Sequence, residues 1–265
     1  MPELPEVEHF TQYFNKHALK QPIENLLIKT KWLIRNITPE KFTKILIGKK
    51  FKKAYRRGKF MVVDINRDPH KIIFHFGMTG DLFYAKVNDK NESLKKYSQV
   101  TFVFTNLNAL YWLNKRKFGG IYLVTNLDEI STLKNMGPEP LNLTKKEFLS
   151  LLDNYKNKNI KAFLMDQSNI AGIGNEYSNE ILFQAGIDPH RKISNLNSQE
   201  KNEIFKKTQA VLKNAINVDT LNQKLPQNWL LAHKKDLICP IGKEHKFKKI
   251  KIAGRSAVYC PLHQK

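Results

Sequence analysis

Apolar side chains near the start of the chain recur at the spacing of a helix. Val7, Phe10, Phe14 and Ala18 lie three or four positions apart, which predicts a helix over about residues 5–18 with one buried face. We expect that face to hold the first residues of the chain against the body of the protein.

The pattern changes between about residues 23 and 125, where short runs rich in β-branched and aromatic residues alternate with polar turns. These runs predict strands within residues 23–34, 60–65, 71–87, 97–105 and 109–124. Several short strands joined by turns indicate a sandwich or barrel-like domain. Residues 88–96 are polar except for Leu94 and predict a mobile loop.

Helical signals follow after Asn126. Thr144-Lys145-Lys146-Glu147 has the Thr-x-x-Glu pattern of a capping box and predicts a helix that runs to about Tyr155. Helical periodicity also covers residues 160–166, 175–185 and 198–216, while residues 218–227 predict a loop. A β-rich half followed by a helical half predicts an α+β protein of two domains with a cleft between them.

The net charge of the chain indicates the kind of ligand that it binds. The 265 residues include 45 Lys and Arg against 24 Asp and Glu, a formal net charge of +21, which predicts a polyanion such as nucleic acid. A membrane surface would attract the same charge, but the chain has neither an apolar run of about 18 residues nor a cleavable signal peptide. We therefore expect a cytoplasmic, nucleoid-associated protein. On charge alone, a well-solvated lysine-rich surface is the alternative.

The first eight residues, Met1-Pro2-Glu3-Leu4-Pro5-Glu6-Val7-Glu8, carry chemistry that depends on their place in the chain. If Met1 is removed, Pro2 carries a terminal secondary amine with a pKa near the α-amino value of about 8. Such an amine can attack an aldehyde carbon and form an iminium. Glu3 and Glu6 offer carboxyl groups that can transfer a proton. The alternative is a proline that merely opens a helix.

Further motifs follow downstream: Arg57-Gly58-Lys59-Phe60, His75-Phe76-Gly77-Met78-Thr79-Gly80, Arg116-Lys117-Phe118-Gly119, Gly172-Ile173-Gly174-Asn175 and a Cys-containing tail. With the first eight residues they resemble, over nearly the whole chain, the formamidopyrimidine-DNA glycosylase/endonuclease VIII family of DNA repair enzymes. The resemblance implies an N-terminal β-sandwich domain with an amino-terminal helix (1–125), a helical domain with a helix–two-turn–helix (126–235), and a C-terminal zinc-finger-like β-hairpin (236–265).

The function implied by this resemblance is base excision repair of damaged double-stranded DNA by a monomer. Such an enzyme removes an oxidised base, of formamidopyrimidine or 8-oxoguanine type, and then cuts the strand at the abasic site as a lyase. Pro2 would attack the sugar C1′, Glu3 would be the acid/base that helps to open the sugar ring, and Lys59 would assist departure of the base. Two alternatives stay open: an endonuclease VIII-like preference for oxidised pyrimidines, and a catalytically silent DNA-binding protein.

The resemblance also assigns DNA contacts. Met78 would fill the hole left by a flipped base, Arg116 would read the orphaned partner base and Phe118 would wedge a base step; otherwise Met78 and Phe118 are core residues. This set favours the formamidopyrimidine branch.

Phosphate contacts are implied for Asn175, Lys161 and Arg255. The glycines before residue 175 would let backbone N–H groups at a helix start face a phosphate; the alternative is a tight turn without a ligand.

The tail departs from the family, which has two Cys-x-x-Cys pairs. This chain has Cys239-Pro240-Ile241-Gly242 and Cys260-Pro261-Leu262-His263, and its two cysteines do not form the pattern of a secreted disulfide framework. We expect His245 to replace the ligand missing at Gly242, so that Cys239, His245, Cys260 and His263 bind one structural Zn²⁺. The alternative is a zincless hairpin held by packing.

Two further departures concern DNA recognition. Residues 217–235 lack the Gly-rich, aromatic-containing loop that closes over 8-oxoguanine in the family, which leaves the lesion preference open. Tyr97-Ser98-Gln99-Val100 stands where the family often has a histidine-rich phosphate contact.

Overall fold

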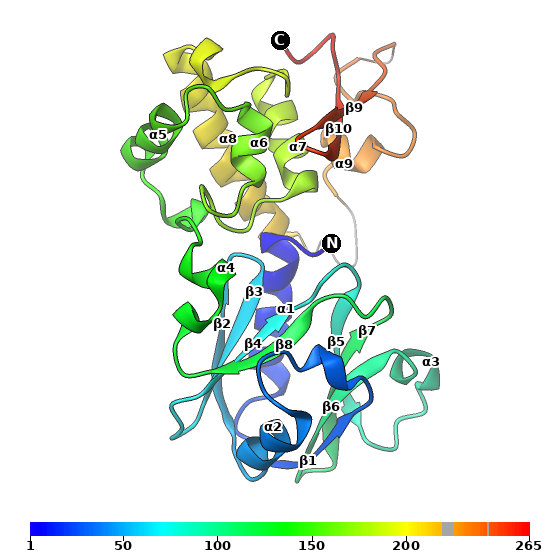
Figure 1. The fold of residues 1–265 in the computed structure, drawn as a ribbon. Coiled ribbons are helices and arrows are strands. Elements are labelled where there is room, and N and C mark those ends of the chain that lie inside the picture. Colours follow the sequence, from blue (N-terminus) through cyan, green and yellow to red (C-terminus); the bar gives the residue numbers. More distant parts are fainter. Residues whose placement is uncertain (219–224, 243) are drawn as a thin grey trace. The chain divides into compact units, whose positions relative to one another are not determined.

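The computed structural model describes residues 1–218, 225–242 and 244–265 (Figure 1). Two compact units divide the chain: residues 1–2 and 6–134 form the first, and residues 3–5 and 135–265 form the second. Residues 236–265 belong to the second unit, and their status as a third domain stays a prediction. Of the loop expected at 218–227, residues 219–224 lie outside the described part.

Two four-stranded antiparallel sheets form the first unit (Figure 1). The first sheet has the order β1 (Ile23–Ile28), β6 (Ser98–Phe104), β7 (Asn108–Asn114) and β5 (Gly80–Lys86). The second has the order β2 (Phe51–Arg57), β3 (Phe60–Ile65), β4 (Lys71–His75) and β8 (Gly120–Val124). Residues of both sheets share one hydrophobic core. The predicted β-sandwich is therefore confirmed.

Aromatic rings join the two sheets in this core. The ring of Phe102 lies 5.6 Å from that of Phe51 and 6.1 Å from that of Phe74 between centroids. Helix α1 (Leu4–His17) adds Phe14, whose ring lies 5.0 Å from that of Phe51. The Asn15 side chain donates to the carbonyl of Ala54 at 2.9 Å and accepts from its N–H at 2.7 Å, which fixes α1 along β2.

The elements of the first unit that were not expected from the sequence include two helices and a strand. The α2 helix (Pro39–Leu46) is capped by Thr38, whose hydroxyl accepts from the N–H of Lys41. Strand β2 contains a register shift between Phe51 and Lys53 that breaks the period-two pattern of a strand. The α3 helix (Glu92–Lys95) lies in the segment expected to be a loop, where the Lys95 ammonium donates to the carbonyl of Val87 at 2.8 Å.

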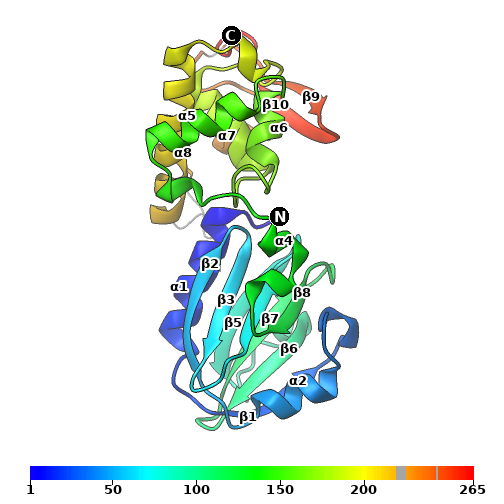
Figure 2. The ribbon, with the colours of Figure 1, turned by 60° about the vertical axis from the view of Figure 1, so that its left-hand side comes forward.

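Helices dominate the second unit (Figure 2). They are α5 (Lys145–Asn154), α6 (Ile160–Met165), α7 (Asn175–Ala185), α8 (Ser198–Asn217) and α9 (Leu230–His233). The capping box at Thr144 is confirmed, because its side chain accepts from the N–H of Glu147 and the Glu147 carboxylate accepts in return. All residues from Tyr177 to Phe183 are buried, which places α7 within the core of the unit.

Short helices complete the two units. They are α4 (Ser131–Lys134) and the 3₁₀ helices Lys31–Leu33, Leu127–Glu129, Pro140–Asn142 and Ile193–Asn195. No helix within the described residues combines the length and the apolar character that a membrane span requires.

A β-hairpin near the carboxyl end packs on α7. Strands β9 (Lys248–Ile252) and β10 (Arg255–Tyr259) are joined by Ala253 and Gly254, both with positive φ, as a tight two-residue hairpin turn requires. Phe247 and Val258 of this region share a buried cluster with Phe183 of α7. The β-hairpin that the resemblance implied within residues 236–265 is therefore present.

Candidate active site

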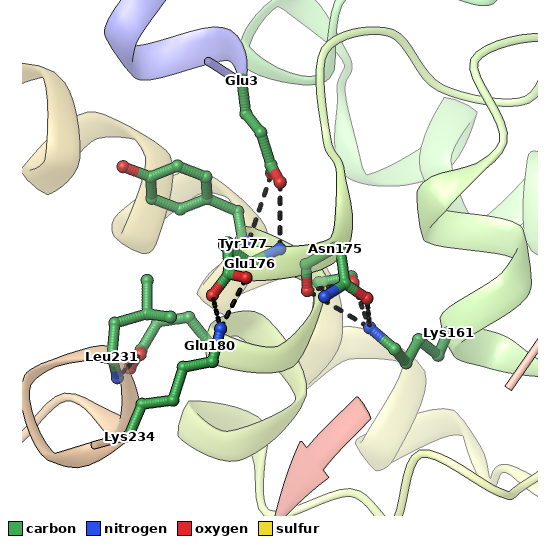
Figure 3. A network of polar contacts seen from close by, with 9 residues as sticks. Glu3, Lys161, Asn175, Glu176, Tyr177, Glu180, Leu231 and Lys234 are labelled. Atoms are coloured by element: carbon green, nitrogen blue, oxygen red, sulfur yellow. Dashed lines mark hydrogen bonds and ion pairs between the residues drawn. The ribbon is translucent and has the colours of Figure 1, made fainter. Parts of the chain in front are cut away.

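The carboxylate of Glu3 caps the amino end of α7 (Figure 3). Its Oε2 accepts from the N–H of Gly174 at 2.7 Å and of Tyr177 at 3.3 Å, and its Oε1 accepts from the N–H of Glu176 at 2.9 Å. Glu3 is only 2% exposed. Backbone donors at a helix start stabilise negative charge, so the arrangement favours the ionised carboxylate. We expected N–H groups here to face a phosphate; these three donate to Glu3 instead.

Leu4 fixes the next residue of the chain to the same turn. Its N–H donates to the carbonyl of Gly172 at 3.0 Å, and a Cβ at position 172 would lie 2.8 Å from the Cβ of Leu4. Gly172 also has a φ of +80°, so glycine is required there for two reasons. The Gln167 side chain, which the sequence did not single out, accepts from the N–H of Gly172 and donates to the carbonyl of Ile173. Pro2 is therefore followed directly by Glu3, which is fixed through its side chain, and by Leu4, which is fixed through its backbone.

Lys161 is fully buried beneath the start of α7. Its ammonium donates to the side-chain oxygen of Asn175 at 3.1 Å, to the Asn175 carbonyl at 3.2 Å and to the hydroxyl of Ser178 at 2.8 Å (Figure 3). Burial lowers the Lys161 pKa to about 8, against the opposing charge of Glu3. The structure thus gives no support for direct phosphate contact by Lys161, and it shows that this side chain orients Asn175.

Glu180 forms a second carboxylate cap one turn further along α7. Its oxygens accept from the N–H of Leu230 at 3.3 Å and of Leu231 at 2.9 Å, at the start of α9, and from the Gln184 amide at 2.8 Å. Glu180 is fully buried, and burial raises its pKa to about 7. Lys234 in turn pairs with the carboxylate of Glu176 (Figure 3). Nothing in the sequence distinguishes Glu180 from other glutamates of helical segments, so its role as a cap of α9 was not expected from the sequence.

Lys59 lies in the two-residue turn between β2 and β3 and is 8% exposed. The guanidinium of Arg56 donates to the carbonyl of Gly58 at 3.2 Å and to the carboxylate of Glu8 at 3.1 Å. Because Glu8 belongs to α1, these bonds fix the turn that carries Lys59 to that helix.

His75 lies beside this turn, opposite Phe60 in the register of β3 and β4. Burial, and then the positive charges of Lys59 and Arg35, lower the pKa of His75. The imidazole is therefore neutral at physiological pH, which keeps a second positive charge away from Lys59.

The loops that carry Met78 and Phe118 touch through their backbones. A Cβ at Gly77 would lie 2.2 Å from the carbonyl oxygen of Phe118. The N–H of Arg116 donates to the hydroxyl of Thr79 at 3.0 Å. The first unit thus brings the three predicted DNA-inserting residues onto one pair of loops.

Exposure separates these side chains from the core. Met78 is 44% and Phe118 is 49% exposed, so neither is a core residue. Fully buried Asn114, which the sequence did not single out, donates to the carbonyl of Phe118 and accepts from the Thr79 hydroxyl, which fixes the two loops from behind.

The tail brings together three of the four predicted metal ligands. Within the described residues, the ligand atoms of Cys239, His245 and Cys260 all lie within 4.8 Å of one another. His263 lies outside this group, and its Nε2 is 2.8 Å from the carbonyl oxygen of Phe183. Arg255 is exposed at the start of β10.

Known proteins are similar to this chain over nearly its whole length. The model of the formamidopyrimidine-DNA glycosylase N-terminal domain matches residues 1–121, and that of its H2TH domain matches residues 136–226. A protein of Desulforamulus reducens named formamidopyrimidine-DNA glycosylase is 33% identical, with 100% of this chain and 99% of the relative covered. The chain belongs to the formamidopyrimidine-DNA glycosylase family. The predicted family is confirmed, and with it a DNA glycosylase of base excision repair.

Other relatives cover the chain equally well. The formamidopyrimidine-DNA glycosylase of Listeria innocua is 29% identical, with 100% of both chains covered. Among solved structures, a complex of the Lactococcus lactis glycosylase with DNA containing an abasic site has a TM-score of 0.85 at 27% identity, over 99% of both chains. A complex of the wild-type Lactococcus lactis glycosylase with DNA containing N7-benzyl-Fapy-dG has a TM-score of 0.84 at 27% identity, over 100% of both chains.

Gly77→Ala tests the contact between the two loops. The added Cβ meets the Phe118 carbonyl, so we expect a loss of stability of about 1–3 kcal/mol and weaker binding of duplex DNA. Gly48→Ala is the matched control, because Gly48 also has a positive φ but no atom within 4 Å of the added Cβ. Thermal unfolding and DNA titration measure both effects. Equal losses in the two variants would show that only the backbone angle matters.

Glu180→Gln tests the buried cap on α9. The raised pKa means that the folded protein holds more protons at Glu180 than the unfolded chain between pH 4.5 and about 7. The contribution of Glu180 to stability is therefore present at low pH and declines as pH rises through this window, by on the order of 3 kcal/mol. Unfolding by denaturant from pH 4.5 to 8 should show this slope in the wild type relative to the variant.

Glu147→Gln serves as the control for this pH dependence. Hydrogen bonds from the Thr144 backbone lower the pKa of Glu147, so its contribution is lost as pH falls. Glu147→Gln should therefore leave the slope between pH 4.5 and 8 as in the wild type and change it only at lower pH. The same slope in both would contradict the assignment to Glu180.

Proposed function

We propose that this chain excises an oxidised base of formamidopyrimidine or 8-oxoguanine type from duplex DNA and then cuts the strand by elimination at the abasic site. The observation that carries the proposal is the anchoring of Glu3 on α7, because it fixes the residue that follows Pro2. A terminal amine is otherwise attached to a frayed end of the chain and has no defined position.

Pro2 is the proposed nucleophile once Met1 has been removed. Its neutral secondary amine attacks the sugar C1′, a nitrogen–carbon bond forms, and the bond between C1′ and the base breaks with its electron pair on the base. Opening of the sugar ring gives an iminium. Loss of a proton from C2′ then expels the 3′ phosphate, and hydrolysis of the iminium returns the free amine.

Glu3 is the proposed acid/base, and Lys59 is proposed to assist departure of the base. The carboxylate of Glu3 directly follows Pro2 in the chain and is held by three backbone N–H groups, and it would exchange a proton with the sugar ring oxygen. An ionised Glu3 acts first as acceptor and then as donor. The ammonium of Lys59 would stabilise negative charge on the departing base.

The DNA-binding surface of the proposed enzyme has two parts. Met78, Arg116 and Phe118 would enter the duplex, and their exposure supports this role. Asn175 and Arg255 would contact phosphates. The inserted set favours a formamidopyrimidine-type lesion over an oxidised pyrimidine; duplexes that carry each lesion separate the two in a base-release assay.

We also propose that the tail binds one structural Zn²⁺. Two thiols and an imidazole lie close enough to share one ion, and zinc accepts this donor set. His245 suits the site because Gly242 makes room for it: a Cβ at position 242 would lie 2.9 Å from two atoms of the His245 ring. Bound zinc would stabilise the fold of the hairpin.

His263 is the proposed fourth ligand. If Nε2 donates to the Phe183 carbonyl, the imidazole is the tautomer in which Nδ1 keeps its lone pair. Metal-binding histidines commonly donate their other ring N–H to a backbone carbonyl in this way. The backbone of His263 is also joined to a neighbouring ligand, because the carbonyl of Cys260 accepts from the N–H of His263 at 3.2 Å.

Extension of the amino terminus tests the nucleophile. A protein that keeps Met1, or carries one added residue before Pro2, should lose covalent trapping by borohydride on abasic DNA, because no terminal secondary amine remains. Its DNA affinity should stay within severalfold of that of the mature protein. Full trapping by the extended form would rule out Pro2. If the mature protein binds DNA without trapping, the chain is the catalytically silent alternative.

Metal analysis tests the tail. We expect one zinc per chain by elemental analysis, and visible absorption bands typical of tetrahedral coordination after replacement by Co²⁺. His245→Ala, His263→Ala and Gly242→Ala should each lower metal content, the last by displacing the His245 ring. If His245→Ala and Gly242→Ala lose metal but His263→Ala keeps it, water is the fourth ligand instead of His263. A metal-free protein that binds DNA equally well with and without chelator would refute the site.

A further inference from the structure

Trp32 is the exposed member of the three tryptophans. It lies in the 3₁₀ helix Lys31–Leu33 and is 61% exposed, whereas Trp112 and Trp229 are 0% and 3% exposed. A single exposed apolar side chain is ordinary. The surroundings of Trp32 are not ordinary, because they join it to the loop that carries Arg116 and Phe118.

Arg35 ties the segment of Trp32 to that loop. Its guanidinium donates to the carbonyl of Gly119, at 3.0 Å from Nε, and its backbone N–H donates to the carbonyl of Ile121 at 2.9 Å. The Asn36 side chain exchanges two further hydrogen bonds with the backbone of Leu123, at 2.7 and 3.0 Å. Trp32 is therefore placed on a surface with fixed geometry relative to residues 116–119.

Cations and aromatic rings alternate over this surface. The ammonium of Lys117 lies 5.6 Å from the ring centroid of Trp32, and the guanidinium carbon of Arg116 lies 5.0 Å from that of Phe118. All four side chains are exposed. Surfaces that bind nucleic acid combine cations for phosphates with aromatic rings on which bases stack.

We propose that Trp32 and Lys117 form a further DNA contact, beside the nucleotides that Arg116 and Phe118 enter. Lys117 exchanges the indole face for a phosphate, and the freed ring of Trp32 packs on the adjacent nucleotide. DNA is the occupant because the patch is positive: Lys31 and Arg35 flank it, and Glu40, 3.7 Å from the ammonium of Lys31, is the acidic partner seen there. The inference rests on the proposed function, since it assumes that the loop of residues 116–119 meets the duplex.

Substitution of Trp32 tests the contact. Trp32→Ala should weaken binding to a duplex with a non-cleavable abasic-site analogue by about 10-fold, within the range for loss of one stacked base. Trp32→Phe keeps an aromatic face and should stay within about 3-fold of the wild type. Leu107→Ala is the control for truncation of an exposed apolar side chain, because Leu107 is 71% exposed on another turn of the same unit. Borohydride trapping and DNA affinity should be unchanged in Leu107→Ala.

Fluorescence gives a readout independent of affinity. In a Trp229→Phe background, buried Trp112 and exposed Trp32 remain, so acrylamide quenching reports mainly on Trp32. Addition of the same duplex should reduce this quenching severalfold. Unchanged quenching together with wild-type affinity of Trp32→Ala would overturn the inference while leaving trapping intact. Protection of Trp32 without trapping by the mature wild type would instead overturn the proposed catalysis and keep the DNA contact.

Discussion

The hydrogen bonds between Glu3 and the start of α7 are the constraint on which the candidate site depends. Each hydrogen bond to a charged group contributes about 1.5–3 kcal/mol, and loss of the carboxylate would leave three buried or half-buried N–H groups without that acceptor. The first residues of most chains are poorly ordered. Here a buried carboxylate orders them, and the residue before it gains a defined position.

This use of the helix start decides how a phosphate can be bound nearby. The N–H groups of Gly174, Glu176 and Tyr177 serve Glu3, so an anion cannot occupy the same donors. In the proposed role, the side chain of Asn175 would then contact the phosphate, and Lys161 holds this side chain by donating to its oxygen. A buried ammonium tolerates this position because it has three oxygen acceptors and the Glu3 charge close by.

The sequence predicted those parts of the fold that obey local rules. Helix α7 and strand β3 begin and end where periodicity places them. Strand β2 escaped prediction because a bulge separates its buried residues Phe51 and Ala54 by three positions. The candidate residues came from motifs, whereas the groups that hold them, such as Asn114 and Gln167, belong to no motif. Their roles follow only from tertiary contacts.

In the tail, the position of the His245 side chain depends on the absence of a side chain at Gly242. The His245 ring occupies the volume that any side chain at position 242 would need, so a cysteine at 242 and this ring position are mutually exclusive. The hydrogen bond from the N–H of His245 to the carbonyl of Gly242, at 2.9 Å, keeps the two residues in one tight turn. The imidazole that lies close to Cys239 and Cys260 thus stands three residues beyond Gly242, and its ring can hold this position only because position 242 is glycine.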